Sequence, residues 1–180
     1  MIYSYDECIK KYGNPYQIEK MLKDEQIYKI ERGIYSDKRA VSELEVIAFK
    51  YPRAVFTMDS AFYYHSLTDV IPEKYHLATD KDAAKIPNAK VKQIFYRKNQ
   101  FEVGVITMEY QNTTIQIYNK ERMLIELIRN KNKIPFDYYK EIIESYRKII
   151  NRMDIEKLQD YIEKLPKQNN IMKAIQLEVL

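Results

Sequence analysis

The sequence predicts an α+β protein in which a small winged helix-turn-helix precedes a mixed α/β domain with a helical C-terminus. Three observations predict this class. Two short helical segments separated by Gly13 are followed by strand-like residues around Gly33. A central region rich in β-branched and aromatic residues alternates with short helical segments. From residue 120 onward, apolar residues recur at the spacing of amphipathic helices.

The first helix is expected to begin after Ser4, because Ser4 and Glu7 have the spacing of a capping box. Gly13 should end it, since glycine enters the left-handed region freely. The residues that share one apolar face of this helix are Tyr5, Cys8, Ile9 and Tyr12.

The second helix should run from about residue 15 to 23. Asn14 is a good N-cap with Gln17 as its capping-box partner, and Pro15 suits the first helical position. Ile18 and Leu22 are expected to face inward. Strand-like residues on either side of Gly33 predict a tight hairpin. Two helices and a hairpin in this order are typical of a winged helix.

A winged helix favours DNA binding, with the second helix in the major groove and the hairpin on the phosphate backbone or in the minor groove. The residues expected to contact DNA are Tyr16, Gln17, Lys20 and Lys23 on the second helix and Lys29 and Arg32 on the wing. The alternative is a winged helix that binds protein and no DNA. Residues 1 to 39 carry eight Lys/Arg against seven Asp/Glu, so a single copy of the module should bind DNA weakly.

The rest of the chain, residues 39 to 180, is expected to form one mixed domain behind a boundary at residue 38. Helices are predicted at 41–49, 59–67, 120–131, 136–152, 154–165 and 167–180. Asp59 or Ser60 is expected to cap the second of these, and the fifth should have an apolar stripe of Ile155, Leu158, Ile162 and Leu165. Strands are predicted at 54–58, 75–79, 91–97, 102–110 and 113–119, with a polar loop at 81–90 and a turn at Gln111–Asn112.

Motifs for catalysis, cofactors and metals are missing from the sequence, so we expect no enzyme and no cofactor. Three glycines exclude most phosphate-binding loops, and the one cysteine, Cys8, excludes an internal disulfide and disfavours a zinc site. His65 is expected to be a packed or hydrogen-bonded side chain. Asp80 and Asp82 flank a lysine where a nucleotidyltransferase has an apolar residue, which indicates a solvated loop. A nuclease with carboxylates scattered in sequence is the weakest alternative.

The chain has a net charge of +4, which permits a nucleic-acid partner without requiring one. No apolar run has the length of a membrane span, the first residues do not resemble a signal peptide, and a single cysteine suits a reducing compartment. We therefore expect a cytoplasmic protein with no membrane partner.

Residues 129 to 152 hold seven Lys/Arg against three Asp/Glu. This excess predicts either a solvated helix face or a basic surface that acts on a partner by electrostatic steering. Arg147, Lys148 and Arg152 lie on the polar side of the predicted apolar stripe, which consists of Phe136, Tyr139, Ile143, Tyr146 and Ile150.

Several stretches, in order along nearly the whole chain, resemble the AbiEi-type antitoxins of type IV (abortive-infection) toxin–antitoxin pairs. The wing Arg32-Gly33-Ile34-Tyr35 resembles the basic wing of that family. Matching positions in the centre are Ser60, Ala61, Tyr63, His65, Leu67 and Asp69, and in the later segment Tyr118, Glu121, Arg122, Leu127, Ile128 and Arg129. Ser66, Met123 and Glu126 stand where the family usually has Gly, Thr and Asp.

The resemblance implies a phage-defence antitoxin and transcriptional repressor that binds inverted repeats in its own operator, an arrangement compatible with a dimer on double-stranded DNA. It also implies that the larger domain counters a toxin of nucleotidyltransferase-like fold, usually without a stable complex. His65 would then belong to the packed interior of that domain.

Overall fold

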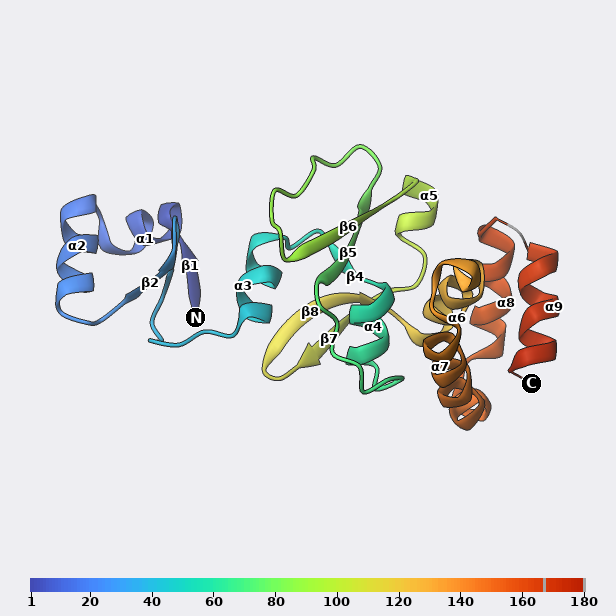
Figure 1. Ribbon diagram of the computed structural model, residues 1–180. Helices are drawn as coiled ribbons and strands as arrows, with labels where there is room; N and C mark the ends of the chain where they lie inside the picture. The colour runs from blue at the N-terminus through green and yellow to red at the C-terminus, as the bar shows by residue number, and fades with distance from the viewer. Residues whose placement is uncertain (167, 180) are drawn as a thin grey trace. The chain divides into compact units, whose positions relative to one another are not determined.

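The computed structural model describes residues 1–166 and 168–179, which fold as a mixed α+β protein with two separate sheets (Figure 1). The chain divides into two compact units, Met1–Pro52 and Arg53–Leu180. The division falls later in the chain than the expected boundary at residue 38. The helix that follows the hairpin is part of the first unit, where Lys50 Nζ lies 2.6 Å from Glu31 Oε1.

The first unit is a three-stranded antiparallel sheet with strand order β1-β3-β2 and three helices. Its strands are β1 (Ile2–Ser4), β2 (Tyr28–Glu31) and β3 (Ile34–Ser36), and its helices are α1 (Tyr5–Tyr12), α2 (Pro15–Lys23) and α3 (Glu43–Lys50). The predicted helices and hairpin are confirmed, whereas β1 was not expected. Its three residues directly precede the first helix, which leaves too short a pattern to recognise.

The predicted caps set the beginning or end of α1 and α2. Ser4 Oγ accepts a hydrogen bond from the Glu7 N–H at 3.2 Å, and Glu7 Oε2 accepts one from the Ser4 N–H at 2.7 Å. Gly13 ends α1 with φ at 98°. Asn14 Oδ1 accepts from the Gln17 N–H at 3.0 Å, but the return bond expected from the Gln17 side chain is not among those of the described residues.

The core of the first unit is formed by Tyr3, Cys8, Ile18, Ile27 and Tyr35, with Ile9, Tyr12, Met21 and Leu22 at its margin. Tyr5, which was expected on the apolar face of α1, is instead 40% exposed. Cys8 is fully buried, and burial raises the pKa of its thiol. This cysteine is therefore a small core residue, as expected.

The second unit contains a five-stranded mixed sheet with strand order β6-β5-β4-β8-β7. Its strands are β4 (Val55–Phe56), β5 (Tyr75–Asp80), β6 (Val91–Tyr96), β7 (Val105–Tyr110) and β8 (Thr113–Tyr118). β4 pairs antiparallel with β5 and parallel with β8, and β5 pairs parallel with β6. Gln111 and Asn112 join β7 to β8 at φ values of 47° and 61°, so the predicted tight turn is confirmed.

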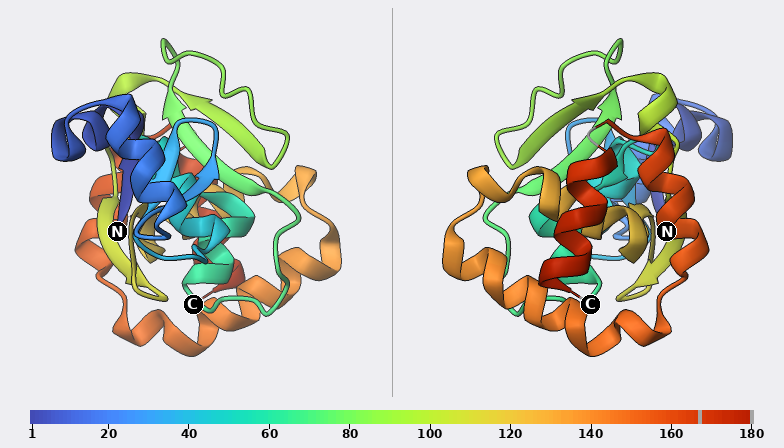
Figure 2. Two further views of the ribbon diagram at one scale, coloured as in Figure 1. Left: turned by 90° about the vertical axis from the view of Figure 1, so that its left-hand side faces the viewer. Right: turned by 90° about the vertical axis from the view of Figure 1, so that its right-hand side faces the viewer.

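The helices of this unit follow the predicted order, with one addition. They are α4 (Met58–Tyr64), α5 (Lys98–Phe101), α6 (Lys120–Arg129), α7 (Phe136–Ile149), α8 (Ile155–Lys164) and α9 (Gln168–Glu178), with 3₁₀ turns at Lys131–Lys133 and Ile150–Arg152. The short α5 was not expected. α6 packs against α4, α8 and α9, and Figure 2 shows α8 and α9 side by side. Residues 167 and 180 of the last predicted helix lie outside the described residues.

Three details of these helices differ from the prediction. α4 begins at Met58, so neither Asp59 nor Ser60 is its N-cap; Ser60 Oγ instead accepts a hydrogen bond from the His76 N–H at 2.9 Å. Phe136 and Ile155, expected on apolar stripes, are 70% and 41% exposed. Each is the first residue of its helix, where there is no preceding turn for the side chain to pack along.

Candidate functional site

The six residues expected to contact DNA are all exposed. Tyr16, Gln17, Lys20 and Lys23 lie on α2, Lys29 lies on β2, and Arg32 lies in the turn between β2 and β3. The first unit therefore presents all of these side chains to solvent.

The packing of α2 explains which side chains it exposes. Ile18 is buried in the core, and Met21 and Leu22 pack against the same core three and four residues later. Tyr16, Lys20 and Lys23 follow one another at spacings of four and three, so they share a stripe on the solvent side. Among the described residues, neither lysine has an acidic side chain within salt-bridge distance.

The hairpin carries the other two cations at its tip and on its first strand. Its two-residue loop is Arg32 and Gly33, and Gly33 has the positive φ, 79°, that the turn requires. The strand register shifts between Lys29 and Glu31, which marks a bulge. Glu31 is paired with Lys50, so its negative charge is offset and Lys29 and Arg32 dominate the exposed charge of the hairpin.

The whole first unit is electrically balanced, because its 52 residues carry nine Lys/Arg and nine Asp/Glu. Phosphate contacts supply most of the affinity of a DNA-binding protein. A single copy of this unit therefore lacks the excess positive charge that would hold DNA without further contacts.

The second expected surface lies at the end of α7 and in the 3₁₀ turn after it. Arg147, Lys148 and Arg152 are exposed. Arg147 also has structural contacts, since its Nε donates to the Glu178 carbonyl oxygen and its Nη1 to Glu144 Oε1, both at 2.8 Å. Of the three, Lys148 and Arg152 make no such contacts with the described residues, whereas the exposed Arg147 side chain is also held in place by these two hydrogen bonds.

A buried ion pair on α6 was not foreseen from the sequence. Arg122 is 0% exposed and Glu126 is 2% exposed. Arg122 Nη2 lies 2.9 Å from Glu126 Oε1, and Arg122 Nη1 donates to the carbonyl oxygens of Gln100 and Val103 at 2.7 and 3.1 Å. The guanidinium also lies over the Tyr118 ring, 4.7 Å from its centroid.

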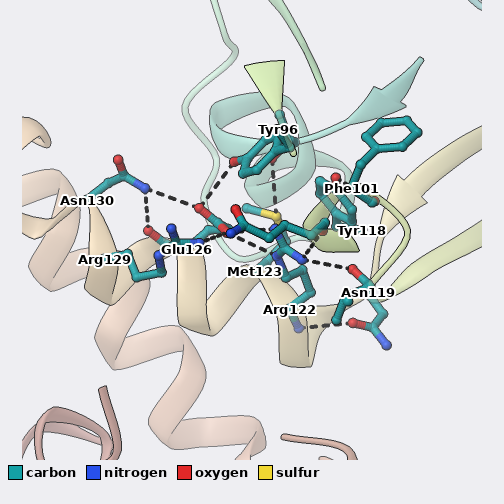
Figure 3. Close-up of polar contacts among 12 residues, drawn as sticks. Tyr96, Phe101, Tyr118, Asn119, Arg122, Met123, Glu126, Arg129 and Asn130 are labelled. Carbon is teal, nitrogen blue, oxygen red and sulfur yellow. Dashed lines mark hydrogen bonds and ion pairs between the residues drawn. The ribbon is translucent and has the colours of Figure 1, made fainter. Parts of the chain in front are cut away.

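The Glu126 carboxylate is the centre of this network (Figure 3). It accepts hydrogen bonds from Tyr96 Oη at 3.1 Å, from Arg129 Nη1 at 2.8 Å and from Asn130 Nδ2 at 3.3 Å, in addition to Arg122 Nε at 3.0 Å. Two cations and two neutral donors thus surround the carboxylate and offset the cost of burying it. The network thus joins α6 to β6.

The sequence signal for this pair was its spacing. Arg122 and Glu126 are four residues apart among apolar neighbours, and Met123, Leu124 and Ile125 between them are all fully buried. When every face of a helix is buried, its charged residues must be buried too. The sequence showed the apolar neighbours, but not that the neighbouring strand and loop would cover the remaining face.

The two histidines have separate environments. His65 Nε2 lies 2.7 Å from the Tyr118 carbonyl oxygen, so the ring donates there, and burial lowers its pKa. This confirms His65 as a hydrogen-bonded residue of the interior. His76 Nδ1 accepts from the Asp59 N–H at 3.3 Å, and its Nε2 lies 3.6 Å from Asp59 Oδ2. Burial lowers the pKa of His76 as well.

His76 and Asp59 line an open cavity of about 930 Å³ within the second unit. Its walls are residues of β5 and β6, the start of α4, the loop before β5, and the segment that leads into α7. Asp80 and Asp82 are not among its lining residues; Asp80 ends β5, Asp82 lies in the 81–90 loop, and Asp80 Oδ1 accepts from the Asp82 N–H. Asp82 is exposed, as expected for a solvated loop.

Among the described residues, no three potential metal ligands of the His, Cys, Asp and Glu types come together. None of the described helices combines the length and the apolar character needed to cross a bilayer. A comparison with models of known protein families finds no match to this chain, and a comparison with curated proteins finds none either.

Proposed function

We propose that the protein is a cytoplasmic DNA-binding repressor of its own operon and the antitoxin of a type IV pair. In this proposal the first unit is a winged helix, with α2 as recognition helix and the β2–β3 hairpin as wing. The observation that carries it is the exposed stripe Tyr16–Lys20–Lys23 with Gln17 beside it, next to a hairpin that presents Lys29 and Arg32. β1 pairs with β3, which completes a three-stranded sheet behind the two helices.

The balance of charge favours a second candidate, in which the first unit binds a protein and no DNA. Nine Lys/Arg offset nine Asp/Glu in this unit, whereas DNA-binding modules usually carry a clear basic excess. Under the first proposal the deficit is met by two copies on an inverted repeat, because each copy then adds its own base and phosphate contacts. The resemblance to AbiEi-type antitoxins supports the first candidate.

A gel shift with the DNA upstream of the protein's own gene distinguishes the two candidates. Full-length protein is expected to bind this DNA in preference to unrelated DNA of equal length. The double variant Gln17→Ala/Lys20→Ala should lose about 1–3 kcal/mol for each base contact removed, because both side chains are exposed and no core contact is lost.

The matched control is Gln159→Ala/Lys173→Ala, which removes the same two side-chain types from exposed positions on α8 and α9. It should bind like the unchanged protein. Equal binding by the α2 variant and this control would refute the assignment of α2 as recognition helix. Failure of the unchanged protein to prefer its own upstream DNA would favour the protein-binding alternative.

A further inference from the structure

The cavity of the second unit has two walls that differ in charge. On the sheet side, Lys92, Ile94 and Tyr96 alternate along β6 and so share one face, and His76 lies beside Lys92 in the register of β5 and β6. Lys74, directly before β5, adds a second exposed cation to this side. Glu73, beside Lys74 in the lining, offsets one of these charges, so the two lysines leave this wall with one net positive charge.

The opposite wall belongs to the first turns of α7 and is acidic. Asp137 and Glu141 are four residues apart on this helix, and both line the cavity. Lys133, just before the helix, also lines it and offsets one of these charges, so this wall keeps one net negative charge. Tyr138, beside Asp137 on α7, also lines the cavity, and burial together with the charges of Asp59 and Glu141 raises the pKa of its hydroxyl. On the sheet side, His76 pairs with Lys92 in the strand register, and its Nε2 lies 3.6 Å from Asp59 Oδ2.

The charges at the two ends do not neutralise each other. Lys74, Lys92 and Asp137 are exposed, and none of them has a salt-bridge partner among the described residues. A ligand of one charge sign would place that charge against a like charge at one end. A ligand with opposite charges at its two ends would meet a complementary wall at each.

Uncharged features of the cavity also indicate a ligand. The Tyr138 hydroxyl is buried and makes no hydrogen bond of good geometry with the described residues, although Thr68 lies near it. Asn130 uses its Nδ2 on the main-chain and side-chain oxygens of Glu126, and Figure 3 shows its amide oxygen turned away from them. Met58 has a φ of 45°, a strained conformation for a side chain of this size.

We propose that this cavity binds a short peptide with free ends. The α-ammonium group lies against Asp137 and Glu141, and the α-carboxylate lies against Lys74 and Lys92. Aliphatic side chains of the peptide pack on the apolar part of the lining, which includes Met58, Ile71, Ile94, Ile134 and Pro135. This inference does not depend on DNA binding by the first unit.

The size of the cavity favours a peptide over a single amino acid. A volume of about 930 Å³ lies near the upper end of the range of roughly 300–1,000 Å³ that holds drug-sized ligands. Three extended residues span about 10 Å, which separates the two charged ends while keeping both inside one site.

Isothermal titration of the full chain with trileucine tests the proposal, because its two ends can be blocked one at a time. Trileucine is expected to bind with a Kd below about 1 mM near pH 7, where both of its ends are charged. N-acetyl-trileucine and trileucinamide each lack one charge and should bind at least tenfold more weakly. Equal binding of the blocked and free peptides, or no binding of trileucine, would overturn the proposal.

Two variants identify which wall meets which end. Lys92→Met should reduce the difference between trileucine and trileucinamide, because only Lys74 then faces the carboxylate, and should keep the penalty for acetylation. Asp137→Asn should do the reverse. Lys98→Met and Glu156→Gln are matched controls, since both residues are exposed and neither lines the cavity. A variant that weakens all three peptides equally would mean that its side chain does not recognise a charged end, and the assignment of ends would be wrong.

Discussion

Arg122 and Glu126, one helical turn apart on α6, form an ion pair at 2.9 Å in which neither side chain reaches solvent. The pair costs desolvation energy that a hydrophobic pair would avoid, so its partners depend on each other. Gln100, Val103, Tyr96 and Arg129 supply the hydrogen bonds that make the burial tolerable.

Arg122→Met should lower the free energy of unfolding by about 3–5 kcal/mol, because the Glu126 carboxylate remains buried without its principal partner. The double variant Arg122→Met/Glu126→Leu should be less destabilised than the single variant, since no buried charge is left uncompensated. Urea denaturation followed by circular dichroism measures both. A double variant at least as unstable as Arg122→Met would show that the hydrogen bonds to Gln100 and Val103 matter more than the charge.

Ser66 has a φ of 56°, in the left-handed region that glycine occupies without strain. It stands where the resembled family usually has glycine. Ser66→Gly is therefore expected to stabilise the protein by up to about 1 kcal/mol and to raise the melting temperature by a few degrees. Ser66→Ala keeps a Cβ at the same φ and should give no such gain. A lower melting temperature for the glycine variant would contradict the strain argument.

Stability should fall as pH drops below about 6.5, the pKa of an unperturbed histidine. Burial lowers the pKa of His65 and of His76 in the folded protein, so the unfolded chain binds these protons first. The loss begins near pH 6.5 and continues down to the folded pKa values. Burial, which Lys120 reinforces, disfavours the charged ring of His65 and outweighs the hydrogen bond to the Tyr118 carbonyl oxygen and the charge of Glu121, which both favour it.

Denaturant midpoints measured between pH 5 and 7.5 check this expectation. His65→Gln keeps a donor for the Tyr118 carbonyl oxygen and removes the titrating ring, so its stability should decline less over this interval than that of the unchanged protein. Carboxylates with lowered pKa values, such as Glu7 and Asp154, lose their contribution only at lower pH. If the stability of His65→Gln declines as much with falling pH as that of the unchanged protein, the pH dependence of stability arises from His76.

Lys148→Glu/Arg152→Glu is expected to weaken rescue of cells from the partner toxin under the proposed antitoxin function. Both side chains are exposed and outside the Arg147 contacts to Glu144 and Glu178, so the fold should be kept. Growth with toxin and antitoxin expressed together measures rescue. Lys85→Glu/Lys98→Glu is the control, with the same change in net charge. Full rescue by Lys148→Glu/Arg152→Glu would mean that these two residues are solvated surface and do not act on the toxin.

Local rules predicted most of the fold. Ser4, Asn14 and Gly13 set the ends of α1 and α2 through hydrogen bonds to residues three or four positions away, and such bonds can be read from spacing. Gln111 and Asn112 likewise form their turn from their own preferences. These elements can be predicted without knowledge of the rest of the chain.

The residues of a candidate site could be predicted from the sequence only where the site requires nothing more than exposed side chains. Lys20 and Arg32 could be expected on the surface because their neighbours are apolar at helical or strand spacing. The cavity could not be expected, because Lys92 and Asp137 come from elements separated by two strands, two α-helices and a 3₁₀ turn in sequence. Their proximity depends on the parallel pairing of β5 with β6, and that register is set by the assembled sheet.

Gly104 lies so close to Arg122 that a Cβ placed on it would come within 2.6 Å of the arginine Cβ. Its φ of 80° also excludes most other residues. Arg122 is in turn held by carbonyl groups of the same loop, at Gln100 and Val103. Because every residue except glycine has a Cβ at position 122, exchanging the arginine side chain alone would not make room for a larger residue at position 104. We therefore expect glycine to be kept at position 104 in descendants of this sequence, even where the residue at position 122 has changed.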